Sequence, residues 1–227
     1  MRRIPIAFLL VSLLAAAPAS AQDVKQFSLG GDEYIAGNQV TLNTPVNHDA
    51  FAAGNAVSVM QPVNGDAHLA GNTVTLNGQV GGTVYAVGNN VSINAGVVDD
   101  VTAAGNNVSL SGERGVGGNA RLAGNTITIG APVGGSALIA AQSVFLDAPV
   151  TGDFYFTGDR ITFSDAARIG GKVTIRTVSP ANVPASVAPA DRVTYERIQS
   201  PEIMTGAGDI ARQSMGGFWQ FFLPALW

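Results

Sequence analysis

Residues 63–76 read Val-Asn-Gly-Asp-Ala-His-Leu-Ala-Gly-Asn-Thr-Val-Thr-Leu, and this arrangement returns along most of the chain. Its most visible part is the tripeptide Ala-Gly-Asn at 70–72. The middle position of that tripeptide, glycine in all copies but one, recurs at 37, 54, 71, 88, 105, 124, 141 and 158. Successive copies are 17 residues apart, except for one step of 19 between 105 and 124. A spacing kept this regularly indicates a structural repeat.

Two apolar columns follow each middle position, three and five residues later, and a Ser or Thr almost always separates them. The first column consists of Val40, Val57, Val74, Val91, Val108, Ile127, Val144 and Ile161. The second consists of Leu42, Val59, Leu76, Ile93, Leu110, Ile129, Leu146 and Phe163. This apolar–polar–apolar alternation is typical of a half-buried strand. A third column, of valines, follows a turn at 46, 63, 80, 97, 116, 133 and 150.

These columns predict an all-β fold, a single-stranded parallel β-helix or β-solenoid of about eight 17-residue coils. We expect it to be right-handed and three-sided, and to cover residues 28–176. One coil cannot bury its apolar side alone, whereas stacked coils about 4.8 Å apart form one continuous core. An antiparallel sandwich is the alternative, but its strands do not normally repeat one column pattern. Leu29, Gly31 and Asp32 fit the register and predict a partial coil before the first full one.

The N-terminus has the three parts of a secretory signal peptide. Met1-Arg2-Arg3 is basic, 4–17 is apolar, and Ala19-Ser20-Ala21 resembles a cleavage site. We therefore expect residues 1–21 to be removed and the protein to be exported to the periplasm or cell envelope. The alternative is an uncleaved N-terminal anchor, although the apolar run is shorter than the ~20 residues that span a bilayer.

The region after the repeat differs in composition. Residues 177–192 contain three prolines and predict an extended Pro-rich linker. Residues 193–227 form a C-terminal tail with an apolar, aromatic end. Its rings favour a membrane interface, and the predicted contact residues are Phe218, Trp219, Phe221, Phe222 and Trp227. The alternatives are a segment that caps the open solenoid end, or the start of a membrane helix in a longer protein.

Composition excludes several classes of protein. Only 12% of the 227 residues are charged, and 12 basic residues stand against 16 acidic ones, unlike the basic face of a nucleic-acid-binding domain. No cysteine is present, which rules out disulfides and thiolate chemistry. His48 and His68 fall at different phases of the repeat, and no nucleophile elbow or phosphate-binding loop occurs. We therefore expect a protein that is not an enzyme, with no catalytic residue and no cofactor.

Two polar columns are the remaining candidates. An asparagine follows six of the glycines and predicts a structural ladder of stacked amides at one corner of the coil, formed by Asn38, Asn55, Asn72, Asn89, Asn106 and Asn125. An acidic column further on includes Asp32, Asp49 and Asp66. These three are weak candidates for binding calcium, which prefers oxygen ligands. Capping of turn amides is the favoured interpretation, so we expect no metal site.

The Gly-Asp and Gly-Asn turns that frame Val-x-Ile/Leu pairs, as in 63–76, resemble the bactofilins, the polymer-forming cytoskeletal proteins of bacteria. The resemblance implies a small right-handed β-helix that polymerises end to end without nucleotide, attaches to membranes and scaffolds envelope enzymes. Members are typically cytoplasmic, whereas this chain begins with an export signal. The expected function is therefore an exported scaffold of the cell envelope, with itself, the membrane surface and envelope proteins as partners. The alternatives are a surface adhesin or glycan-binding solenoid, and an enzyme accessory whose site lies in the tail.

Overall fold

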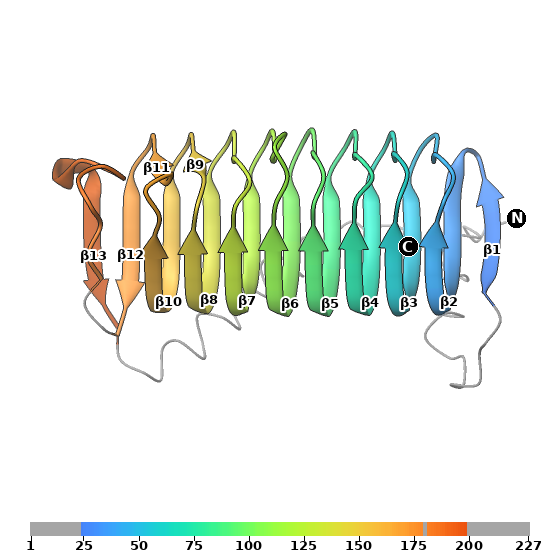
Figure 1. Cartoon of the computed structure of the whole chain (residues 1–227), viewed down its shortest axis with the longest axis horizontal. Helices are drawn as coiled ribbons and strands as arrows, with labels where there is room; N and C mark the ends of the chain where they lie inside the picture. The colour runs from blue at the N-terminus through green and yellow to red at the C-terminus, as the bar shows by residue number, and fades with distance from the viewer. Residues whose placement is uncertain (1–23, 179–180, 199–227) are drawn as a thin grey trace, which may run out of the picture.

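The protein is a rod in which the chain coils along the long axis, so that strands of successive coils stack into an 11-stranded sheet, beside a separate two-stranded sheet (Figure 1). The computed structural model describes residues 24–178 and 181–198. Its elements are β1 (Lys25–Leu29), β2 (Asp32–Leu42), β3 (Ala50–Val59), β4 (Ala67–Leu76), β5 (Val84–Ile93), β6 (Val101–Leu110), β7 (Ala120–Ile129), β8 (Ala137–Leu146), β9 (Pro149–Val150), β10 (Phe154–Phe163), β11 (Arg168–Ile169), β12 (Val173–Thr177), the 3-10 helix η1 (Ala190–Arg192) and β13 (Val193–Arg197). The expected signal peptide and the aromatic end of the tail lie outside the described residues.

The 17-residue repeat sets the register of the sheet. Each strand from β2 to β8 pairs in parallel with the next, so that Gly54 lies opposite Gly37 and Val57 opposite Val40. A separate ladder of parallel bridges joins the third valine column, beginning with Val46 and Val63. The predicted parallel β-solenoid is therefore confirmed. Three ladders of parallel pairing therefore run along the rod. Two of them lie on either side of the glycine corner, and the third joins the valine column.

Alternation of side chains builds the core. In β5, Val91 and Ile93 are each 1% exposed, whereas Ser92 between them faces outward and is half-buried. The middle glycines allow successive coils to approach closely at the corner. A Cβ on Gly71 would lie 2.7 Å from the carbonyl oxygen of Gly54. Only small residues fit this position, and Ala141 is the one copy with a methyl group there.

The N-terminal end differs from the sequence prediction. Residues 25–29 do not form a partial parallel coil; they form β1, which pairs antiparallel with β2. Gly30 and Gly31 connect the two strands with φ values of +66° and +100°. Positive φ at both positions is the mark of a type I′ turn, whose twist suits a two-residue hairpin. The predicted partial coil was therefore wrong for Leu29, because the Gly-Gly pair reverses the chain there. Gly31 and Asp32 keep the repeat register, since their oxygens accept the N–H groups of His48 and Asp49.

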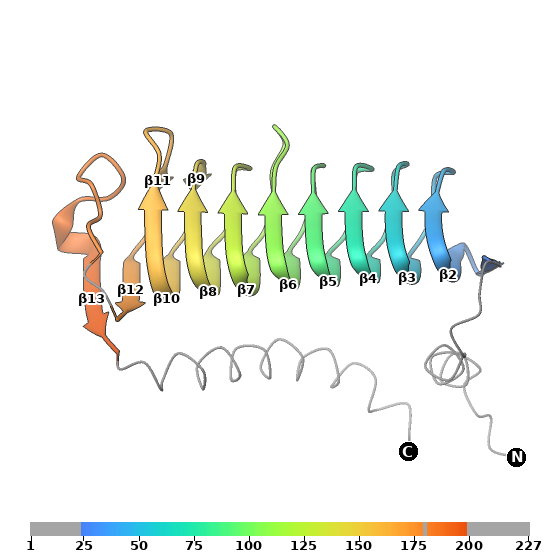
Figure 2. The ribbon, with the colours of Figure 1, turned by 60° about the horizontal axis from the view of Figure 1, so that its bottom comes forward.

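The C-terminal end also differs from prediction. Within the segment expected to be an extended linker, Val187 and Ala188 are 3% and 2% exposed and belong to the hydrophobic core. The N–H of Ile169 donates to the carbonyl oxygen of Val187 at 2.9 Å. Downstream of this segment, β13 pairs in parallel with β12 and adds one more strand to the rod. The linker prediction failed because Val187 and Ala188 pack into the core at the end of the last coil. Figure 2 shows the segment before β13 folded at this end of the rod.

Candidate functional site

A column of side-chain oxygens runs along one corner of the rod. Asp32, Asp49 and Asp66 belong to it, together with residues 83, 100, 119, 136 and 153. Asp49 Oδ1 accepts the backbone N–H of Asp66 at 2.8 Å, and Asp66 Oδ1 accepts that of Thr83 at 2.7 Å. The same contact recurs further along, up to Lys172 N–H and Asp153 Oδ1 at 2.7 Å. Each acceptor therefore satisfies an amide of the following coil.

The calcium candidates have a structural role in this column. One oxygen of each of Asp32, Asp49 and Asp66 accepts a backbone N–H from the next coil. Within residues 24–178 and 181–198, no group of three or more histidine and acidic side chains is placed to hold a metal ion. The carboxylates thus cap amides, as the favoured interpretation proposed, but across coils rather than within their own turns.

Glycines at one position of the repeat lie directly against the oxygen column. A Cβ on Gly82 would lie 2.1 Å from Asp66 Oδ1, and one on Gly118 would lie 2.3 Å from Asp100 Oδ1. Residue 83 is threonine and accepts no amide of the next coil in the described structure; there, Asp99 stands at the equivalent position in place of glycine. An acceptor in one coil therefore usually goes with a glycine in the next; His48, which faces Asp32, is an exception, and there the amide contact of Asp49 is longer, at 3.2 Å.

The six predicted ladder asparagines, such as Asn72, lie exposed beside the corner glycines. No side-chain hydrogen bond joins the members of this column in the described chain, so the predicted amide ladder does not form there. Strand pairing skips this corner residue, and its amide faces solvent. Amide pairs occur in other columns instead. Asn107 Nδ2 donates to Asn90 Oδ1 at 2.8 Å, and Asn94 Nδ2 donates to Asn77 Oδ1 at 2.9 Å.

Five rings form a continuous stack on the outer surface of the first coils. Phe27, Tyr34, Phe51, His68 and Tyr85 follow one another with centroid distances of 4.7, 4.7, 4.6 and 5.0 Å. Adjacent ring planes differ by no more than 5°. Sequence reasoning missed this stack, although four of its rings keep the 17-residue spacing. Because each inner ring is covered on both faces, the stack is a stabilising feature rather than a platform for a ligand.

His68 lies inside this stack. Burial lowers its pKa from the ordinary value, whereas the nearby carboxylates of Asp66 and Asp49 act in the opposite direction. Its Nδ1 atom is buried and has no hydrogen-bond partner in the described part of the protein. The neutral imidazole is therefore the form that the stack favours. His48, the other histidine, is largely exposed and lies 4.0 Å from Asp32.

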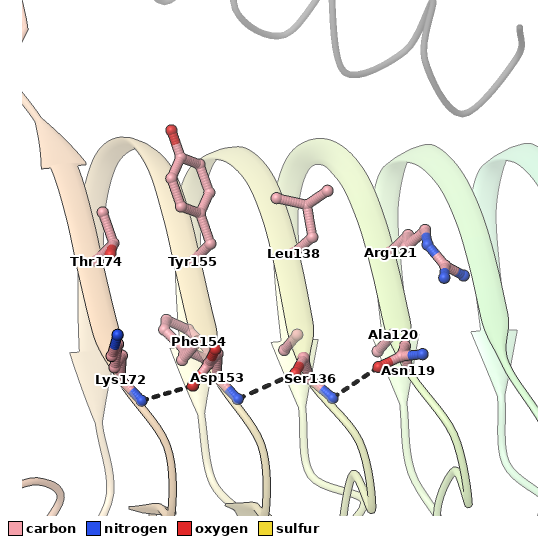
Figure 3. Close-up of a pocket in the computed structure, with 11 residues that line it drawn as sticks. Asn119, Ala120, Arg121, Ser136, Leu138, Asp153, Phe154, Tyr155, Lys172 and Thr174 are labelled. Carbon is pink, nitrogen blue, oxygen red and sulfur yellow. Dashed lines mark hydrogen bonds between the residues drawn. The ribbon is translucent and has the colours of Figure 1, made fainter.

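A shallow groove of about 410 Å³ crosses the same surface nearer the C-terminal end (Figure 3). Oxygen-column residues such as Asp153 line one side, and Tyr155 stands outward next to the shorter Leu138. Arg121 and Lys172 also line the groove. Arg121, Leu138 and Tyr155 occupy the same outward-facing column as the stacked rings, but only one of the three is aromatic. The groove thus combines polar, charged and aromatic groups.

Comparison of the chain with models of known protein families, with curated proteins and with solved structures finds no match. In the described ranges, no helix is both long enough and apolar enough to cross a membrane.

Proposed function

We propose that this protein is an exported structural protein of the bacterial cell envelope that associates with itself through the ends of its β-solenoid. The observation that carries the proposal is the exposed edge strand β1. All five of its residues are exposed, including Phe27 at 39% and Leu29 at 59%. An edge strand with exposed apolar side chains is a template for pairing with another chain. The resemblance to polymer-forming bactofilins supports the same function.

The hairpin geometry shows which backbone groups are available for this pairing. In a two-residue hairpin the closing pair, Leu29 and Asp32, exchanges hydrogen bonds, and the direction of the backbone groups then alternates. The N–H and C=O groups of Gln26 and Ser28 therefore point away from β2, toward the free edge. Two copies of β1 can pair antiparallel with Gln26 of each opposite Ser28 of the other. This register is symmetric about Phe27.

The same register joins the aromatic stacks of two copies. Phe27 stacks on Tyr34 at 4.7 Å and is the terminal ring of the stack. In the symmetric pair, Phe27 of one copy lies directly opposite Phe27 of the other, at a position where side chains approach closely. The pairing would thus bury the exposed ring face and leave β1 without a free edge. At the other end, β13 is the last strand of the sheet, with Tyr195 50% exposed, and provides a second surface for assembly.

Envelope location and membrane attachment complete the proposal and rest on the sequence. The signal peptide supports export, and the aromatic end of the tail supports contact with a membrane surface. Many tails on one assembly would bind more persistently than a single tail. The proposed role requires no catalytic step and no cofactor.

Proline at position 26 tests the interface. Gln26→Pro removes an N–H that faces the free edge, and proline is tolerated at such edge positions. We expect chain 22–227 to form oligomers or filaments, as measured by analytical ultracentrifugation and electron microscopy. Gln26→Pro should shift it to smaller species, whereas the matched Gln26→Ala should not. A strictly monomeric parent chain at high concentration would reject self-association, and unchanged assembly of Gln26→Pro would reject β1 as the interface.

A further inference from the structure

The outward-facing column that forms the ring stack in the first coils also contains non-aromatic residues further along the rod. In the first coils a ring occupies every position from Tyr34 to Tyr85. At Tyr155 the coil neighbours in register are Leu138 on one side and Thr174 on the other. Both are shorter than the tyrosine ring, and in the described structure no other ring stacks on it. Among the described residues both faces of the Tyr155 ring therefore lack a stacked ring, whereas the inner rings Tyr34, Phe51 and His68 are covered on both faces.

The tyrosine is held in place from behind. Arg176 Nη1 donates to the Tyr155 hydroxyl at 3.1 Å, and Arg176 Nε forms an ion pair with Glu196 at 2.8 Å. Figure 3 shows the ring of Tyr155 standing outward and extending farther than Leu138, so that a step forms above the leucine. The ring is therefore a fixed wall of the groove, which is the property expected of a binding surface that is formed in advance.

Two cations line the same groove, Lys172 in the coil after Tyr155 and Arg121 two coils before it. Arg121 Nη1 donates to Asp100 Oδ2 at 2.9 Å, and its side chain remains 40% exposed. Its other guanidinium N–H groups can still donate. Lys172 is exposed, and its ammonium group forms no ion pair among the described residues. The one carboxylate that lines the groove, Asp153, already accepts the backbone N–H of Lys172.

The chemistry of a matching ligand follows from these groups. A pyranose ring is apolar on its face and polar at its rim, so it can pack on Tyr155 while its hydroxyls contact the polar oxygen column. A carboxylate on that ring gains a charge-assisted bond from Lys172 or Arg121. Nucleic acid does not fit, because the protein has a net charge of −4 and the lining of the groove offers only two basic side chains to a phosphate backbone. The groove crosses several coils, which suits a linear chain of sugars.

We infer that the groove around Tyr155 binds a linear acidic glycan, with a carboxylate-bearing sugar packed on the tyrosine ring and its acid group at Lys172. Arg121 contacts a neighbouring sugar across Leu138. The residues that line the groove belong to neither β1 nor β13, and the inference does not depend on self-association. It gives an envelope protein a way to hold an acidic polysaccharide along the side of the rod.

A short oligogalacturonide and its methyl ester are suitable probes, because they share the sugar rings and differ in charge. Calorimetric titration of chain 22–227 should show tighter binding of the acid than of the ester. Tyr155→Ala should weaken binding of both probes, by roughly tenfold for the acid. Lys172→Ala should weaken only the acid, also by roughly tenfold, because one charge-assisted hydrogen bond is lost.

Two further variants make the test independent of folding. Leu138→Tyr would place a ring next to Tyr155 at the spacing of the stack, covering one face of Tyr155 and the place of the neighbouring sugar, which should preserve the fold and weaken binding. Thr102→Ala, in the same column but outside the groove, should bind as the parent chain does. The inference is overturned if the parent chain binds neither probe, if acid and ester bind equally, or if Leu138→Tyr binds normally. Oligomer size, measured in the same samples, reports separately on the proposed function.

Discussion

Replacing Asp66 with alanine removes the oxygen that accepts the N–H of Thr83 at 2.7 Å. A hydrogen bond to a charged acceptor contributes ~1.5–3 kcal/mol, but this amide lies near the surface, where water can replace part of the bond. We therefore expect a loss of about 1–2 kcal/mol in the free energy of unfolding. Thr83→Ala is the matched control in the same column, because Thr83 caps no amide of the next coil; it should cost less than about 0.5 kcal/mol.

Gly82 extends this test to a double-mutant cycle. In Gly82→Ala the new Cβ would lie 2.1 Å from Asp66 Oδ1, so the carboxylate must turn away and release the same N–H. Contacts of 3.0 Å with Gly65 remain in either background. The Gly82→Ala change should therefore be less destabilising by about 1–2 kcal/mol when Asp66 is already alanine. Urea denaturation followed by circular dichroism measures each variant. Strictly additive losses would refute the coupling between acceptor and glycine.

Three other predictions concern the core, the ring stack and the tail. Val91→Asp should cost several kcal/mol of stability, because it buries an unpaired carboxylate, whereas Ser92→Asp should change the melting temperature little; equal melting temperatures would contradict the facing of these side chains. Because the pKa of His68 is lowered in the folded protein, the unfolded chain binds more protons below about pH 6.5. Stability should therefore fall as the pH drops below that value, and His68→Phe should remove this part of the pH dependence. Chain 22–227 should sediment with liposomes largely independently of salt, and deletion of 217–227 should release it; full sedimentation of the truncated chain would reject membrane contact by the tail.

Much of the fold could be predicted because one column pattern repeats. Val40, Val57 and their equivalents specify both the strand and its register, since a shift by one residue would expose the whole apolar column. The two ends were harder to predict because the repeat stops there. The Gly30-Gly31 pair is a hairpin signal by itself, but it also fits the repeat register. The Pro-rich stretch before β13 resembles a linker, and only the apolar surface left by the last coil shows why it packs.

The candidate sites were less predictable because they depend on how columns face each other. The ring stack was visible as a spacing of 17 residues from Tyr34 to Tyr85, yet its members differ in residue type and were not read as one column. The groove at Tyr155 exists because its two neighbours in the column, Leu138 and Thr174, are not aromatic. No sequence motif marks such a position. The asparagine ladder was predicted from the recurrence of asparagine after the corner glycine, but the structure leaves those side chains exposed to solvent.

The N-terminal hairpin makes the end strand of the rod different from the strands of the repeated coils. An open edge of a regular parallel solenoid would present nearly the same column pattern as every other coil, so a second copy could pair with it in many registers. β1 has the sequence Lys-Gln-Phe-Ser-Leu and runs antiparallel, so it has no equivalent elsewhere in the rod. A partner strand must match this one segment, and the symmetric register about Phe27 is the one that joins the two ring stacks. In the proposed assembly β1 would therefore favour one pairing geometry at the N-terminal end of the rod, without closing that edge to its own copy.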